Sequence, residues 1–124
     1  MFVVIQCAAS KSGAYLRAAD GREVFFVAQP EKAPENDRYV YAHPDDPSGD
    51  GLTWREKLLR YNEKGENPQK LARAFELYDN AVYRSLVDVL GIEKVFILSA
   101  GWGLIRAEFL TPYYDITFNR GVAR

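Results

Sequence analysis

Two short runs of apolar residues predict buried strands. Phe2–Cys7 (FVVIQC) is β-branched and aromatic with little alternation, and Val95–Leu98 (VFIL) has the same character. Continuous apolar runs of this kind are typical of strands covered on both faces, as in parallel sheets. The helical pattern between them would supply the crossover that a parallel pair needs. We therefore expect the two strands to be parallel neighbours in one sheet.

A β-hairpin is predicted soon after the first strand. The segments Tyr15–Ala18 and Glu23–Ala28 flank Asp20-Gly21, a dipeptide that favours tight hairpin turns. The middle of the second arm, Val24–Val27, is apolar on both faces, which favours a position inside a sheet.

The composition changes between Pro30 and Gly51, where four of the six prolines gather with several aspartates. This pattern indicates a surface loop over residues 30–51, interrupted by one extended piece at Arg38–Ala42. Thr53, with Glu56 three residues later, matches a capping box, and we expect a short helix from there to about Tyr61.

A long helix is predicted to open at Asn67-Pro68 and to end at a left-handed Gly91. Asp79-Asn80 is the point at which it could break into two pieces. Its apolar positions recur at spacings of three and four, at Leu71, Phe75, Tyr78, Val82, Leu86 and Val89. A single helical turn is expected at Leu104–Phe109.

These elements predict one α/β domain over residues 1–124, with a small, mainly parallel sheet flanked by helices. Apolar residues make up 48% of the 124-residue chain and aromatic residues 14%, which excludes global disorder. No apolar run approaches the ~20 residues that span a bilayer, and the N-terminus lacks the pattern of a secretory signal, so we expect no membrane association. With Cys7 as the one cysteine, a cytoplasmic location is the expectation.

The charge balance excludes a strongly basic nucleic-acid-binding surface. Sixteen lysines and arginines stand against seventeen aspartates and glutamates, giving a net charge of −1. The charges are segregated, because the 31–50 stretch is acidic and the following Trp54–Arg60 segment is basic. A local basic patch remains compatible with this pattern.

Two loops are the candidate ligand site. In open parallel sheets, ligands gather beyond the carboxyl ends of the strands, where the loops Cys7–Gly13 and Ser99–Arg106 are expected to meet. Together they offer hydroxyls, cations, close backbone approach and aromatic rings suited to a phosphate or a nucleobase. The predicted ligand-binding residues are Ser10, Ser12, Ser99, Gly101, Trp102, Gly103, Arg106 and Tyr114, with Lys11 as a further cation.

Lys11 and Asp115 are the candidate catalytic residues. Asp115 follows a Thr-Pro-Tyr-Tyr run that turns the chain back toward the two loops. A carboxylate held near Lys11 or Arg106 would act as a general base or orient a ribose hydroxyl. A surface salt bridge is the alternative for Asp115.

Simpler interpretations of the same residues stay open. The small residues after the first strand also suit a tight turn, and Gly101-Trp102-Gly103 also suits a sharp turn with a core tryptophan. Cys7 fits a small core residue better than a nucleophile, because the one histidine, His43, lies far away in the acidic loop. We predict no metal site and, since no Walker or dinucleotide motif is present, no cofactor.

Three blocks of the chain resemble YaaA-like proteins, the peroxide stress proteins and their uncharacterised relatives. The blocks are VVIQCAASK at 3–11, ILSAGWGLIR at 97–106 and PYYD at 112–115, with a helix bearing Leu77-Tyr78 and Tyr83 before the second block. The resemblance implies a stress-response role, DNA binding or protection, and an α/β core like that of uracil-DNA glycosylases. It implies a nucleotide-directed or nucleic-acid-directed site that includes Ser10, Lys11, Gly103, Arg106, Tyr114 and Asp115.

The family's members are longer, and their later strands complete the sheet. This chain is therefore either the N-terminal part of a longer protein or a shortened version, whose exposed sheet edge a partner or a second copy would cover. The leading functional hypothesis is a domain that binds nucleic acid or a nucleotide between the two loops, with base-directed chemistry as one form of it. The alternative is a non-catalytic interaction or decoy protein that uses its sheet edge or acidic loop. Whether the chain is an enzyme stays open.

Overall fold

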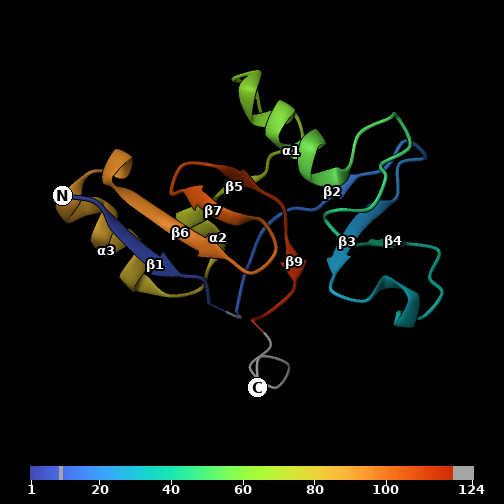
Figure 1. Ribbon diagram of the computed structural model, residues 1–124, viewed down its shortest axis with the longest axis horizontal. Coiled ribbons are helices and arrows are strands. Elements are labelled where there is room, and N and C mark those ends of the chain that lie inside the picture. The colour runs from blue at the N-terminus through green and yellow to red at the C-terminus, as the bar shows by residue number, and fades with distance from the viewer. Residues whose placement is uncertain (9, 119–124) are drawn as a thin grey trace.

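Three strands form the sheet that carries the candidate site. In the computed structural model, which describes residues 1–8 and 10–118 (Figure 1), β1 (Val3–Gln6) pairs in parallel with β6 (Val95–Ser99). The prediction of parallel neighbours is confirmed. β7 (Gly103–Arg106) then returns antiparallel to β6. Ala9, in the predicted loop after the first strand, lies outside the described residues.

A second sheet is built around β3 (Glu23–Val27). β2 (Leu16–Arg17) pairs antiparallel with it, which confirms the hairpin, and β4 (Tyr39–Ala42) pairs in parallel on its other side. The predicted extended piece within the 30–51 loop is thus a strand. β9 (Tyr114–Asp115) also joins β3 in parallel. In Figure 1, β9 lies between the β1–β6–β7 sheet and β2–β4.

The fold is a small mixed α/β fold, so the prediction of a mainly parallel sheet is wrong. The strands divide among three sheets, the third being the antiparallel pair β5 (Ala72–Arg73) and β8 (Leu110–Thr111). The reason is local, because tight turns after β2 and β6 send the chain straight back beside the strand it has just left. Such hairpins need no helical crossover.

The first helix forms as predicted. α1 (Trp54–Glu63) opens with a capping box in which the Thr53 side chain accepts from the Glu56 N–H and the Glu56 carboxylate accepts from the Thr53 N–H. Each bond satisfies a donor that the first helical turn leaves without an intrahelical partner. Two short 3₁₀ helices also form, η1 (Pro30–Lys32) and η2 (Ile92–Lys94).

The long helix predicted from Asn67 to Gly91 is wrong in its first half. After β5 the chain forms one turn of helix, α2 (Ala74–Leu77), becomes extended at Tyr78 and restarts as α3 (Ala81–Leu90). Asn80 accepts the Val82 N–H through its side chain and so begins α3. Short polar side chains favour such caps over helix interiors, which is why the break falls at Asp79-Asn80.

The helical turn expected at Leu104–Phe109 is also wrong. Gly103–Arg106 forms β7, with Ile105 opposite Ile97 and buried against the core. Continued pairing with β6 uses the backbone donors that a helical turn would have used internally. Ala107 extends this pairing by donating to the Val95 carbonyl.

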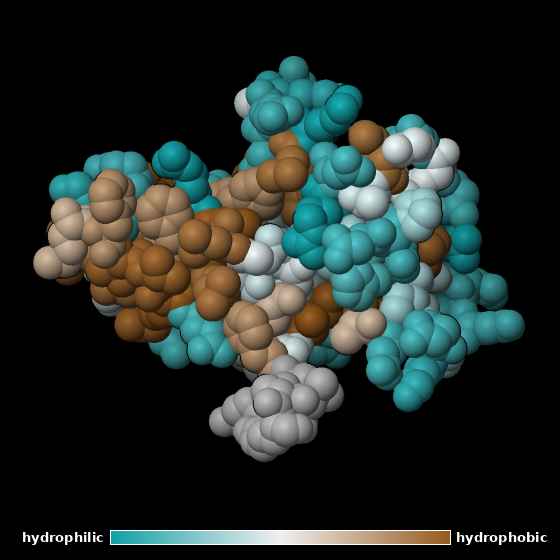
Figure 2. Space-filling model, in the orientation of Figure 1, coloured by the Kyte–Doolittle hydropathy of each residue, from teal (hydrophilic) through white to brown (hydrophobic). Residues whose placement is uncertain are grey.

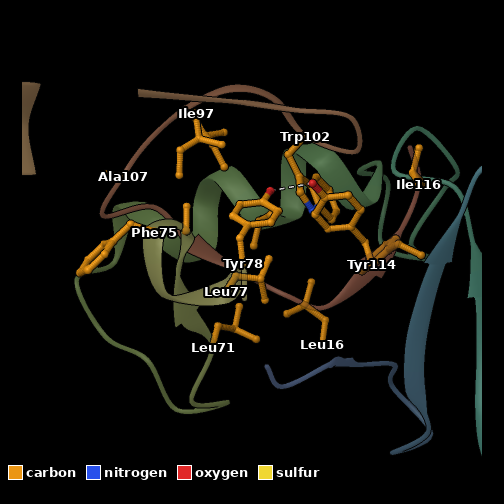
Figure 3. Close-up of a cluster of buried hydrophobic side chains, with 14 of the residues drawn as sticks. Leu16, Leu71, Phe75, Leu77, Tyr78, Ile97, Trp102, Ala107, Tyr114 and Ile116 are labelled. Carbon is orange, nitrogen blue, oxygen red and sulfur yellow. Dashed lines mark hydrogen bonds between the residues drawn. The ribbon is translucent and has the colours of Figure 1, made fainter. Parts of the chain in front are cut away.

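The core joins the two larger sheets. Val95, Ile97 and Ile105 face inward from the first sheet, and Val24 and Phe26 face inward from the second. Between them lie α2, Tyr78, Trp102 and Tyr114, as Figure 3 shows. The residues that hold the fold together therefore also surround the carboxyl ends of β1 and β6.

Phe75→Ala is expected to lower the free energy of unfolding by about 3–5 kcal/mol, because Phe75 is 4% exposed. The matched control is Val89→Ala on α3, where a side chain 79% exposed should cost less than about 0.5 kcal/mol. Urea denaturation of both variants measures the difference. Equal losses in the two variants would contradict the placement of α2 in the core.

Candidate functional site

The carboxyl ends of β1 and β6 lie side by side and define the candidate site. The Cys7 N–H donates to the Leu98 carbonyl at 2.9 Å, and the Ala100 N–H donates to the Cys7 Sγ at 3.3 Å. Cys7 is half-buried and its thiol accepts from the turn after β6. The two segments predicted to meet are therefore joined, through Cys7 and Ala100.

The loop after β1 is fixed to the segment between α2 and α3. The hydroxyls of Ser10 and Ser12 both donate to the Asp79 carboxylate, at 3.0 and 2.8 Å. Backbone hydrogen bonds run from Ser12 to Leu77 and from Asp79 to Ser10. Both predicted serines thus hold the loop in place through Asp79, a residue that the sequence marked only as a possible helix break.

Lys11 lies at the centre of this loop. Its ammonium sits 4.5 Å from the centre of the Tyr114 ring, a distance suited to a cation–π contact. Partial burial lowers the pKa of Lys11, while the nearby Cys7 and Asp115 act in the opposite direction. The structure thus brings the predicted pair Lys11 and Asp115 together, with Asp115 exposed at the end of β9.

Three buried hydroxyls lie beneath Lys11. The Tyr114 hydroxyl is 2.6 Å from the Tyr78 hydroxyl and 2.7 Å from the Ser99 hydroxyl, and Figure 3 shows the two tyrosines directed toward each other. Burial raises the pKa of Tyr78 to about 12 and raises that of Tyr114 as well. Tyr83 stacks on Tyr78 and donates to the Gln6 carbonyl.

The turn after β6 is shaped by these same residues. The Ser99 hydroxyl accepts the N–H groups of Gly101 and Trp102, at 3.3 and 3.1 Å. A Cβ on Gly101 would lie 2.9 Å from the Tyr114 ring, and Gly103 has a φ of +82°, so both positions favour glycine. The close approach that Gly101 allows is to the protein's own tyrosine.

Trp102 and Tyr114 are placed in the core and not over a ligand. Trp102 is 6% exposed and packs edge-on against Phe26 at 4.8 Å, and Tyr114 is fully buried. The expectation that these two rings contact a ligand is therefore corrected, because the simpler interpretation of Gly101-Trp102-Gly103 as a turn with a core tryptophan describes this placement. Trp102 Nε1 is buried without a hydrogen-bond partner among the described residues.

Arg106 does not reach the Lys11 site. It pairs with Phe96 in β7, at the opposite end of the strand from Gly103, and its guanidinium lies 5.8 Å from the Phe96 ring. The expectation that Lys11 and Arg106 share one site is corrected by the antiparallel return of β7. The cation beside the turn is instead Arg55, which donates to the Gly101 carbonyl at 3.1 Å and to Asp45 at 2.7 Å.

The acidic loop and the basic helix that follows it neutralise each other in part. Asp45 pairs with Arg55, and Asp50 pairs with Lys57 at 3.1 Å. Within residues 1–8 and 10–118, no group of three potential metal ligands comes together. Over the same residues, no helix has the length and apolar character needed to cross a bilayer.

Comparisons with protein-family models, with curated proteins and with solved structures find no match to this chain. The YaaA-like resemblance thus rests on the three sequence blocks alone.

The buried tyrosines make stability sensitive to alkaline pH. Their pKa values are raised in the folded state, so the unfolded chain releases protons first and stability falls as pH rises above 10. Lys11 has the opposite effect on stability. Because its pKa is lowered in the folded state, it raises stability as pH rises, but only up to its ordinary pKa of 10.5. Between pH 10.5 and 12 we expect a loss of about 2 kcal/mol or more.

Urea denaturation across that pH range measures this loss. Tyr78→Phe should give a shallower fall than the parent protein, because it removes one of the titrating groups. Tyr41→Phe, which changes a half-exposed tyrosine on β4, is the control. A parent protein whose stability does not change between pH 10.5 and 12 would contradict the buried hydroxyl network.

Proposed function

We propose that this chain binds a nucleotide, or nucleic acid through a phosphate, at the site around Lys11. The observation that carries the proposal is the placement of a half-buried lysine at the adjoining carboxyl ends of two parallel strands. Ligands of α/β proteins gather at such strand ends. The partly desolvated ammonium offers an anion a stronger interaction than a fully hydrated surface lysine would.

The neighbouring groups suit a nucleotide more than a simple anion. Asp115 lies near Lys11, Asp79 accepts from the serines that precede and follow it, and carboxylates accept hydrogen bonds from ribose hydroxyls. We propose that Lys11 contacts the phosphate and that Asp115 orients a sugar hydroxyl. The YaaA-like resemblance, with the nucleic-acid-directed role that it implies, supports the same ligand class.

The net charge of −1 favours a specific site over general attraction to nucleic acid. Mononucleotides should therefore bind at the Lys11 site without help from a wider basic surface. A base-directed reaction would use Asp115 as its general base, and it is the catalytic form of the same proposal.

Lys11→Ala is expected to weaken the binding of a mononucleotide such as dTMP by about ten- to a hundredfold, because one charge-assisted hydrogen bond is lost. Lys11→Arg should retain most of the affinity. Lys94→Ala, which removes an exposed lysine from η2 before β6, is the matched control. Isothermal titration calorimetry at low salt measures all four proteins.

Binding of dTMP that is equally strong in Lys11→Ala and in the parent protein would overturn the proposed site. Absence of binding by the parent protein to dTMP, AMP and inorganic phosphate would overturn the proposed function. Circular dichroism and thermal denaturation of each variant separate a lost contact from a lost fold.

A second candidate function, self-association, is favoured by one face of the first sheet. The sheet formed by β1, β6 and β7 has one face that points away from the core. The side chains on it are largely apolar, and we call it the apolar sheet face (Figure 2). Exposed apolar areas of several hundred Å² commonly mark interaction surfaces, and a stable interface takes roughly 800 Å² from each partner. The most exposed residues of this face are Met1, Phe2, Val4, Leu98 and Leu104.

We propose a second copy of the chain as the occupant of this apolar sheet face. A charge placed on this face, as in Leu104→Glu on β7, should convert a dimer to a monomer in sedimentation equilibrium experiments. Val89→Glu puts the same charge on exposed α3 and should leave the dimer intact. A parent protein that is monomeric at 100 μM, a concentration on the order of a weak dimer's Kd, would contradict self-association.

A further inference from the structure

The outer face of the second sheet carries a group of five aromatic rings. On β3, Val24 and Phe26 point into the core, so Phe25 between them points outward. The register places Tyr41 beside Phe25 on β4, while Tyr113 immediately precedes the β9 residue that pairs with Phe26. We call the five outward rings the aromatic face, and its members are Tyr15, Phe25, Tyr39, Tyr41 and Tyr113.

The rings of the aromatic face form one connected cluster. Phe25 lies at its centre, with ring-centre distances of 5.3 Å to Tyr39, 5.4 Å to Tyr41 and 5.7 Å to both Tyr15 and Tyr113. All five are half-buried, so each ring packs on its neighbours through one side and meets solvent with another. Mutual packing also restricts the rings, so a ligand that stacks on them loses little side-chain entropy.

Basic groups lie at both ends of the aromatic face. At one end, three arginines line a recess of about 480 Å³ together with Asp20 and Glu23. Arg22 pairs with Asp20, Arg38 pairs with Glu23, and Arg17 donates to a carbonyl. A guanidinium has five N–H donors, so a single carboxylate contact leaves it able to bind a phosphate as well.

The other end of the aromatic face leads to the Lys11 site. The Tyr113 N–H donates to the Ala14 carbonyl, which fixes the segment leading to β9 beside the loop that carries Lys11. Asp115, which neighbours Lys11, follows Tyr113 by two residues and so lies on the same outward side of β9. A chain laid across the rings would therefore run between the arginines and Lys11.

We infer that the aromatic face binds a single-stranded nucleic acid, with bases stacked on the tyrosines and the backbone directed to the arginines and to Lys11. This inference rests on the proposed function for its ligand class. Aromatic platforms bordered by cations bind single strands with little sequence preference. Strands of a sheet are about 4.8 Å apart, so a face three strands wide accommodates two or three bases.

The test compares the binding of dTMP, (dT)4 and (dT)12 by isothermal titration calorimetry at 50 mM NaCl. In the parent protein, (dT)4 should bind at least tenfold more tightly than dTMP. Tyr41→Leu, which keeps an apolar side chain but removes the ring, should weaken (dT)4 binding by about fivefold or more and leave dTMP binding unchanged. Tyr41→Phe should retain the gain, because it keeps the stacking surface.

Phe2→Leu is the control, because it removes a 70% exposed ring from the other sheet and should change neither ligand's affinity. Tyr39→Leu is the second variant, and it protects the test if Tyr41→Leu unfolds. Oligothymidylate binding that is no tighter than dTMP binding would overturn the aromatic face as a platform while the proposed function stands. No binding of dTMP or of either oligonucleotide would overturn both.

A further measurement distinguishes a nucleic acid from a peptide as the partner of the aromatic face. Half-exposed tyrosines also accept proline-rich peptides, so a decaproline peptide is measured in parallel. Decaproline binding that is lost in Tyr41→Leu, together with no oligothymidylate binding, would overturn the nucleic-acid assignment in favour of a peptide. Oligothymidylate binding that is lost in Tyr41→Leu, with no decaproline binding, supports it.

Discussion

The buried contact between the hydroxyls of Tyr78, Tyr114 and Ser99 is the interaction on which the rest of the structure depends. It joins three segments that are distant in the sequence: the break before α3, the end of β6 and the start of β9. Because these three residues are buried, a lost partner would leave a buried polar group unsatisfied. The Tyr114 ring contacts the Lys11 ammonium, and it also lies so close to Gly101 that a side chain there would clash with it. The candidate site is thus the outer surface of the fold's own polar core.

This arrangement explains why so many polar residues near the site are committed to structure. Ser10 and Ser12 hold the Lys11 loop against Asp79, and Ser99 holds the turn after β6. The backbone that carries Lys11 is thereby held in place, with Asp115 near its ammonium. Such preorganisation lowers the entropic cost of binding, so a small site can still be specific.

Much of the fold could be predicted where a single local signal determines the structure. The apolar runs of β1 and β6, the Asp20-Gly21 hairpin and the Thr53 capping box are signals of this kind. The prediction of one long helix over residues 67–91 was wrong. Apolar residues at spacings of three and four also arise when a strand, a helical turn and a second helix pack in succession on the same core. Lys11 and Asp115 were predicted as neighbours. Arg106 was wrongly predicted to lie beside Lys11, because no local sequence signal indicates that β7 returns antiparallel to β6. Asp79, Arg55 and the aromatic face depend on pairings far apart in the sequence, which one sequence does not reveal.

We propose that ligand recognition occurs at the joined ends of β1 and β6. Mapping amide chemical-shift changes by NMR during a dTMP titration tests it directly. We expect the largest changes at the amides of Lys11, Ser12, Asp79 and Ala100, with α3 residues 84–89 unaffected. Saturable changes centred on any other surface, with these four amides unmoved, would contradict it.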